Sequence, residues 1–241
     1  MPLPARLPDP PMTPVGHVIY LHGFASSPAS TKARWFGRAL AAHGLEMACP
    51  DLNHPAFETL TVTRMVEQAH RAVEAAPANP VALIGSSLGA FVALLAAAAD
   101  RRGSVDRLVL LAPALDFGGN RLRDLGGHGI AEWRARGSLT VFHYGDGAPR
   151  EVGFGLYEDA AAHDALAVSV PVPALVFQGR HDQSVSPVMV ERWAAGQPQV
   201  DLRLLDDDHQ LTASMDVIWP EVERFLARER PVFRPAGGGP T

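Results

Sequence analysis

The sequence is poor in cysteine, long apolar segments and basic charge. Cys49 is the only cysteine among 241 residues, which excludes an intrachain disulfide, a cysteine-based zinc site and a Cys-x-x-Cys redox pair. The longest apolar run, Phe91–Ala99, is too short to span a bilayer. The net charge is −5, so we expect no basic surface that would draw the chain to nucleic acid.

Several common motifs are also missing. The sequence has neither Gly-x-Gly-x-x-Gly after its first apolar run nor Gly-x-x-x-x-Gly-Lys-Ser/Thr, which disfavours a nucleotide-binding protein. It lacks His-Glu-x-x-His, and we expect the pairs His163-Asp164 and His181-Asp182 to be hydrogen-bonded loop residues rather than metal ligands. We therefore expect no metal and no cofactor. The proline-rich start lacks the apolar segment of a signal peptide, so we expect a cytoplasmic protein.

The remaining composition is that of one folded domain. Hydrophobic residues make up 47% and charged residues 20% of the chain, which is enough to bury a core. We expect a single domain over 15–229, between a flexible proline-rich N-terminus (1–14) and a flexible tail (230–241).

Apolar runs of strand length alternate with helical patterns along this domain. Strands are expected at His17–Leu21, Glu46–Cys49, Val81–Gly85, Arg107–Leu111, Ala174–Gln178 and Asp201–Leu205. Helices are expected at Thr31–His43, Thr61–Ala76, Leu88–Asp100, Pro187–Ala195 and Met215–Arg228. Strands without polar alternation are buried on both faces. The pattern predicts an α/β fold with a mostly parallel sheet and helices on both sides.

The alternation breaks once, between about residues 116 and 165. Paired glycines punctuate short pieces there. Leu139–Tyr144 and Glu151–Phe154 are predicted to form a hairpin across a Gly-Asp-Gly-Ala-Pro turn. We expect this segment to be a cap inserted after the fourth strand rather than a separate domain.

The most informative segment is Gly85-Ser86-Ser87-Leu88-Gly89, which joins a buried strand directly to a helix. A Gly-x-Ser-x-Gly motif can arise by chance, but at such a junction it is typical of a sharp turn that presents the serine above the sheet. The two glycines leave room for that turn. Ser87 is therefore the candidate nucleophile, and the Leu88 N–H at the start of the helix is a candidate donor to an oxyanion.

The loop after the first strand offers a second donor. It reads His22-Gly23-Phe24, and the Phe24 N–H is the candidate for the other half of an oxyanion hole. Alone, this segment could be an ordinary glycine turn. We expect His22 to have a structural, hydrogen-bonding role.

A serine nucleophile needs a base and an acid that orients the base. Asp182 follows the fifth expected strand and His209 follows the sixth, so Ser87, Asp182 and His209 occur in the order typical of hydrolases. None of the other nine histidines follows the last strand. Asp116 and the run Asp206–Asp208 are the rival acids.

These motifs resemble those of the α/β-hydrolase superfamily over nearly all of residues 15–229. The segment 21–28 (Leu-His-Gly-Phe-Ala-Ser-Ser-Pro), with Lys32-Ala33 nearby, is similar to small bacterial esterases of the YqiA/YcfP type. The resemblance implies hydrolysis of carboxylic esters or thioesters by Ser87, Asp182 and His209. Too few residues precede His17 for the superfamily's usual leading antiparallel strands, so we expect six strands.

Two kinds of alternative stay open. A non-catalytic ligand receptor can share this fold, and a peptidase or amidase can use the same three residues. A dehalogenase would need a carboxylate where Ser87 stands. If the chain is an esterase, its partner is a small acyl ester or thioester.

Aromatic and aliphatic residues of the cap could line an acyl pocket. The main candidates for this lining are Trp133, Phe142 and Tyr157. Four further residues of the cap could also line it: Leu122, Leu125, Tyr144 and Phe154. The alternative is that they form the insertion's own small core.

Overall fold

The computed structural model describes residues 16–77, 80–118 and 129–227. The predicted terminal segments, 1–14 and 230–241, lie outside these residues, as do Leu122, Leu125 and Arg228. The strands are β1 (His17–Leu21), β2 (Met47–Ala48), β3 (Val81–Ser86), β4 (Val105–Leu111), β5 (Ser138–His143), β6 (Ala148–Gly153), β7 (Ala174–Gly179) and β8 (Val200–Leu205). The helices are α1 (Thr31–Ala42), η1 (Phe57–Thr59, a 3₁₀ turn), α2 (Val62–Glu74), α3 (Leu88–Ala99), α4 (Gly129–Arg136), α5 (Gly155–Ala160), α6 (Pro187–Ala195) and α7 (Met215–Ala227).

Six strands form one sheet in the order β2-β1-β3-β4-β7-β8, and every neighbouring pair is parallel. This confirms the expected six-stranded parallel sheet. Its carboxyl ends meet at one edge, because all six strands run in the same direction. The loops after β1, β3, β7 and β8, which carry the candidate site residues, therefore share that edge.

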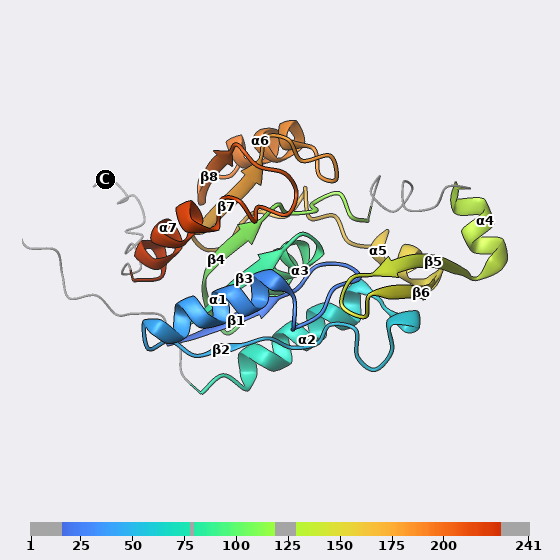
Figure 1. Ribbon diagram of the computed structural model, residues 1–241, viewed down its shortest axis with the longest axis horizontal. Helices are drawn as coiled ribbons and strands as arrows, with labels where there is room; N and C mark the ends of the chain where they lie inside the picture. The colour runs from blue at the N-terminus through green and yellow to red at the C-terminus, as the bar shows by residue number, and fades with distance from the viewer. Residues whose placement is uncertain (1–15, 78–79, 119–128, 228–241) are drawn as a thin grey trace, which may run out of the picture.

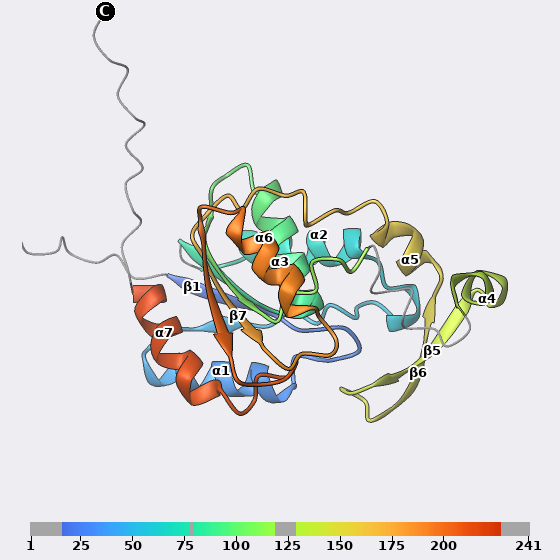
Figure 2. The same cartoon turned by 90° about the horizontal axis from the view of Figure 1, so that it is seen from above.

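Successive apolar residues of β1, β3, β4 and β7 enter two different hydrophobic cores. In β1, Val18 and Tyr20 pack in the core formed with α1 and α7, whereas Ile19 and Leu21 pack in the core formed with α2, α3 and α6. Figure 2 shows α1 and α7 on one side of the sheet and α2, α3 and α6 on the other. Burial on both faces explains why these strands lack polar alternation.

Helix starts follow from local capping. The side chain of Ser30 accepts a hydrogen bond from the Ala33 amide before α1. Thr61, the expected cap of α2, accepts one from the Arg64 amide. Each side chain pairs one of the amides that the first turn leaves free.

Two strands differ from their predicted bounds by two residues, whereas β3, β7 and β8 differ by one and β1 has the predicted bounds. The predicted strand 46–49 is reduced to the two residues of β2. The fourth strand begins two residues earlier than expected, at Val105. Asp106 and Arg107 are both buried there as an ion pair with Nη2 and Oδ2 2.5 Å apart, and Arg107 also donates to the Phe225 carbonyl oxygen at the end of α7. Mutual neutralisation lets charged residues stand inside a buried strand.

The insertion contains the predicted hairpin, together with α4 and α5, which the sequence did not indicate. β5 and β6 pair antiparallel, with His143 opposite Ala148, so the turn is shorter than the one predicted. Gly147 lies in that turn with φ +66°, a conformation that glycine adopts without strain. Figures 1 and 2 show β5, β6 and α4 projecting from one end of the molecule.

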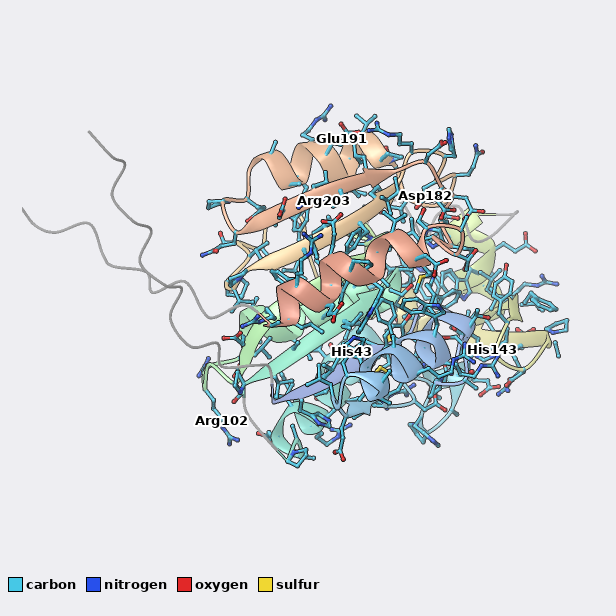
Figure 3. The ribbon with its side chains drawn as sticks, turned by 60° about the vertical axis from the view of Figure 1, so that its left-hand side comes forward. His43, Arg102, His143, Asp182, Glu191 and Arg203 are labelled. Carbon is cyan, nitrogen blue, oxygen red and sulfur yellow. The ribbon has the colours of Figure 1, made fainter. Side chains whose placement is uncertain are left out.

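That projecting end is the end where the sheet's carboxyl edge lies. Figure 3 shows Asp182, which follows β7, on the same side of the molecule as His143 of the hairpin. Arg102, which follows α3, lies on the opposite side. The hairpin thus adjoins the edge that carries the candidate site.

Candidate active site

Ser87 stands at the sharp turn between β3 and α3. Its backbone has φ +54° and ψ −115°, a strained conformation for a residue with a side chain. A Cβ on Gly85 would overlap the backbone of Gly89 and Ala90, and a Cβ on Gly89 would overlap the Leu21 carbonyl. The turn can therefore form only because both positions are glycine.

Backbone hydrogen bonds hold this strained turn. The Ser87 N–H donates to the Leu111 carbonyl of β4 at 2.8 Å. The Ser87 carbonyl accepts from the amides of Ala90 and Phe91 at 3.0 and 3.2 Å. Strain of this kind persists where the surrounding structure fixes the backbone, and it is common at functional sites.

The structure brings Ser87, His209 and Asp182 into one chain of hydrogen bonds. His209 Nε2 lies 3.1 Å from Ser87 Oγ, and His209 Nδ1 lies 2.8 Å from Asp182 Oδ2. The carboxylate can only accept, so Nδ1 carries the proton and Nε2 is free to accept one from the serine. The serine is 122 residues from the histidine along the chain.

Asp182 is buried and fully hydrogen-bonded. Its Oδ1 accepts from the amides of Ser184 and Val185 at 2.7 and 2.8 Å, and its Oδ2 also accepts from Gln178 Nε2 at 2.9 Å. Burial acts to raise the pKa of Asp182, but the hydrogen bond and charge of His209, together with these other donors, hold it below its ordinary value. The group thus stays an anion that can orient the imidazole.

The rival acids that follow β8 have other partners. Asp206 Oδ1 lies 2.6 Å from His181 Nε2 at the surface. Asp207 accepts from the Asp208 amide, and Asp208 accepts from the Gln210 amide. Among the aspartates after β7 and β8, the contact with His209 belongs to Asp182.

The two candidate oxyanion donors belong to segments that lie next to Ser87. Leu88 is the first residue of α3. A Cβ on Gly23, the residue before Phe24, would lie 3.5 Å from the Cβ of Ser87, so this loop abuts the serine. Among the described residues, neither the Phe24 N–H nor the Leu88 N–H has an acceptor.

His22 is buried and makes two hydrogen bonds to the backbone. Its Nδ1 lies 3.0 Å from the Gly23 carbonyl, and its Nε2 accepts from the Leu52 amide at 3.0 Å. These bonds shape the loop that carries Phe24, as expected of a structural histidine.

Comparison with known families agrees with this geometry. The model of a family described as an uncharacterised protein family, UPF0227, matches residues 17–226. The chain belongs to UPF0227. No curated protein matches its sequence.

Solved structures place this UPF0227 protein in the α/β-hydrolase fold, which confirms the predicted resemblance. A provisionally assigned hydrolase from Agrobacterium vitis S4 is similar with a TM-score of 0.77 and 24% identity, covering 90% of this chain and 92% of that one. Est1E from Butyrivibrio proteoclasticus, with ferulic acid bound, has a TM-score of 0.75 and 18% identity, covering 88% of both chains. Mouse α/β-hydrolase domain-containing protein 10 has a TM-score of 0.72 and 21% identity, covering 87% and 89%. At such identities the likeness shows the fold.

The three candidate pocket residues occupy different environments in the insertion. Trp133 is buried, its indole N–H donates to the Val152 carbonyl at 3.2 Å, and its ring packs against Phe154 and Tyr157. Phe142 is 51% exposed and contacts Tyr144, edge to face. Trp133 and Tyr157 thus pack with each other inside the insertion, and Trp133 belongs to the core on the α2 and α3 side of the sheet. A role of all three candidates in substrate binding stays a prediction.

Two residues at the site were not predicted to act there. Gln178 is buried and binds Asp182, and the signal for it was a single polar residue in an otherwise apolar strand. Lys32 Nζ donates to the Gln210 carbonyl at 2.8 Å, next to His209 along the chain. Sequence reasoning noted Lys32 without finding this contact, because the two segments are far apart in the chain.

Other features lie away from Ser87. A hollow of about 560 Å³, lined by residues of α1 and β2 with His17 and Glu46, opens at the amino end of the sheet. Within residues 16–77, 80–118 and 129–227, no three His, Cys, Asp or Glu side chains form a cluster that could hold a metal. In the same ranges no helix is long and apolar enough to cross a membrane.

Proposed function

We propose that this UPF0227 protein is a serine hydrolase that cleaves carboxylic esters or thioesters. The observation that carries the proposal is the hydrogen-bonded chain from Ser87 Oγ through His209 to the buried Asp182. It occurs at a strained strand-to-helix turn, which is the setting of a nucleophile in this fold. Est1E, which shares the fold, binds ferulic acid, a carboxylic acid of the kind that ester hydrolysis releases.

The first half-reaction forms an acyl-enzyme. Ser87 Oγ attacks the carbonyl carbon of the substrate while His209 Nε2 takes the hydroxyl proton. The tetrahedral oxyanion accepts hydrogen bonds from the N–H groups of Phe24 and Leu88, each of which contributes about 3 kcal/mol by analogy with measured oxyanion-hole donors. The carbon–oxygen or carbon–sulfur bond then breaks, and the leaving group takes the proton from His209.

The second half-reaction releases the acid. A water molecule gives a proton to His209 Nε2 and attacks the acyl carbon. Collapse of the second tetrahedral intermediate frees the carboxylic acid and returns the proton to Ser87 Oγ. Asp182 holds the imidazole with its Nδ1–H toward Oδ2 throughout and stabilises its charged form.

Covalent labelling tests the proposal without a guess about the substrate. The protein would be treated with a fluorophosphonate probe and mapped by peptide mass spectrometry, beside the variants Ser87→Ala, His209→Ala and Ser86→Ala. We expect stoichiometric label on Ser87 in the wild type and in Ser86→Ala, and none in the other two. Ser86 is the matched control because it is the adjacent serine, at the buried end of β3.

A folded wild type that takes no label would refute the proposal and favour a non-catalytic receptor. A labelled protein would then be tried on a panel of esters, thioesters and anilides. Turnover of anilides alone would assign an amidase instead.

A further inference from the structure

Lys32 connects helix α1 to the loop that carries His209. It is the only lysine in the chain, which has 21 lysines and arginines in all. Its Nζ donates a 2.8 Å hydrogen bond to the carbonyl oxygen of Gln210, 178 residues away. Since Gln210 directly follows His209, this bond joins α1 to the backbone next to the imidazole.

In the loop after β8, aspartate side chains accept hydrogen bonds from backbone amides, whereas Lys32 donates one to a backbone carbonyl. Asp207 accepts from the amides of Asp208 and Ser214 at 2.8 and 2.9 Å. Asp208 Oδ1 accepts from the Gln210 amide at 2.7 Å. Carboxylates can accept but cannot donate, so these aspartates cannot pair with the Gln210 carbonyl. Lys32 supplies the donor.

The peptide that Lys32 holds is next to a strained residue. Leu211 has φ +54° and is fully buried in the core between the sheet, α1 and α7. A leucine adopts this conformation only where surrounding contacts enforce it. The Gln210 carbonyl belongs to the peptide that enters Leu211, so its bond to Lys32 restrains the orientation of that peptide.

Lys32 occupies a place that a cation would ordinarily avoid. It is in the first turn of α1, where the helix dipole is unfavourable to positive charge. Burial lowers the pKa of Lys32 to about 8, against the attraction of Asp208, Asp182 and Asp207. These carboxylates come from the loops after β7 and β8 and offset part of that cost.

We propose that Lys32 is a positioning residue for the base, because its ammonium group holds the Gln210 carbonyl and so keeps His209 between Ser87 and Asp182. The inference rests on the proposed function of that site. Lys32 acts through His209, so its loss should slow the step at Ser87 while leaving substrate binding almost unchanged.

The test compares Lys32→Met, which removes the donor, with Lys32→Arg, which keeps a charged donor. The readouts are the rate of fluorophosphonate labelling at Ser87, and kcat and KM with 4-nitrophenyl acetate. We expect Lys32→Met to lower the labelling rate and kcat by about 10- to 100-fold, as displacement of a catalytic group does, with KM within about twofold. In Lys32→Arg, the logarithm of the labelling rate and of kcat should fall by no more than half as much as in Lys32→Met. If Lys32→Met lowers Tm by more than about 10 °C, Lys32→Gln replaces it.

Hydrogen exchange of the peptide spanning 206–214 gives a readout independent of catalysis. It should be faster in Lys32→Met than in the wild type and Lys32→Arg. Equal labelling rates in the wild type and Lys32→Met would overturn the inference and leave the proposed function standing. Equal losses of labelling rate in Lys32→Met and Lys32→Arg would do the same. An unlabelled wild type would overturn the proposed function, whereas the exchange difference would still establish the tie between Lys32 and the loop.

Discussion

The parallel sheet and the hairpin insertion are stabilised in different ways. Every residue of β3, β4 and β7 is buried, and their side chains fill two cores. In β5, three residues are partly covered, two are exposed and only His143 is buried. A strand buried on both faces tolerates little change in side-chain volume, whereas a half-exposed strand can adjust.

The insertion is joined to the domain by apolar and by polar contacts. Trp133, Val152 and Leu156 are buried in the core on the α2 and α3 side of the sheet, and polar contacts lie nearer the surface. Thr63 donates to Asp159 of α5 from both its amide and its hydroxyl, at 2.8 and 2.6 Å. Arg150 of β6 lies 2.8 Å from Glu58. The Tyr144 amide donates to the Ala25 carbonyl at 2.7 Å, beside the loop that carries Phe24. Exposed ion pairs contribute about 0–1 kcal/mol each. On the proposed function, the sheet supplies the reacting groups and the insertion is the candidate for selecting the substrate.

The largest effect is expected at Asp182, which is held by the sheet edge. Asp182→Asn keeps the side chain's shape but replaces the carboxylate by an amide. The amide faces His209 either with its NH2 group, a donor, or with its oxygen, a weaker acceptor than the carboxylate. By analogy with the aspartate of serine proteases, kcat should fall by about three to four orders of magnitude while the fold is kept. Steady-state kinetics on an ester that the wild type cleaves would measure it.

Asp206→Asn is the matched control, because Asp206 is an exposed neighbour bound to His181. We expect its kcat to stay within about twofold of the wild type, as for a surface substitution away from the site. A larger loss in Asp206→Asn than in Asp182→Asn would reverse the assignment of the acid.

The second largest effect is expected when glycine is replaced by alanine next to the sheet rather than in the insertion. Gly89→Ala places a Cβ against the Leu21 carbonyl, so β1 or α3 must shift. Overpacking of this kind costs about 3 kcal/mol, or about 6 to 12 °C in Tm for a domain of this size. Gly155→Ala at the start of α5 meets nothing within 4 Å, so its Tm should change by less than about 3 °C. Thermal unfolding, monitored by circular dichroism, would measure both Tm values. Equal changes of Tm in the two variants would contradict the expected difference between the two regions.

The smallest effect concerns substrate choice. Trp133→Leu disturbs the core of the insertion, and Trp193→Leu makes the same change in α6, outside the insertion. We expect Trp133→Leu to change the ratio of octanoyl to acetyl ester turnover by about three- to tenfold, the scale of a few methylene contacts. The ratio should stay constant in Trp193→Leu. Equal ratios of octanoyl to acetyl ester turnover in both variants would show that Trp133 does not affect substrate choice.

Local features of the site could be predicted from consecutive residues. The turn at Ser87 needs a strand, two glycines and a helix within a few positions, and each is visible in the chain. The parallel sheet could be predicted as well, because strands buried on both faces lose polar alternation. The helices α4 and α5 were missed because the glycine-rich segment 116–165 has no clear helical period.

Contacts between distant segments were decided by the tertiary structure. Strand order brings β8 beside β7, and only then does His209 meet Asp182 rather than another of the neighbouring aspartates. The same packing sets Gln178 against Asp182 and Lys32 against Gln210. The sequence by itself determined which strand, turn and helix present Ser87, because these depend on local backbone sterics. The partners of that serine depend on which distant loops share the sheet edge, which only the packing of the whole chain decides.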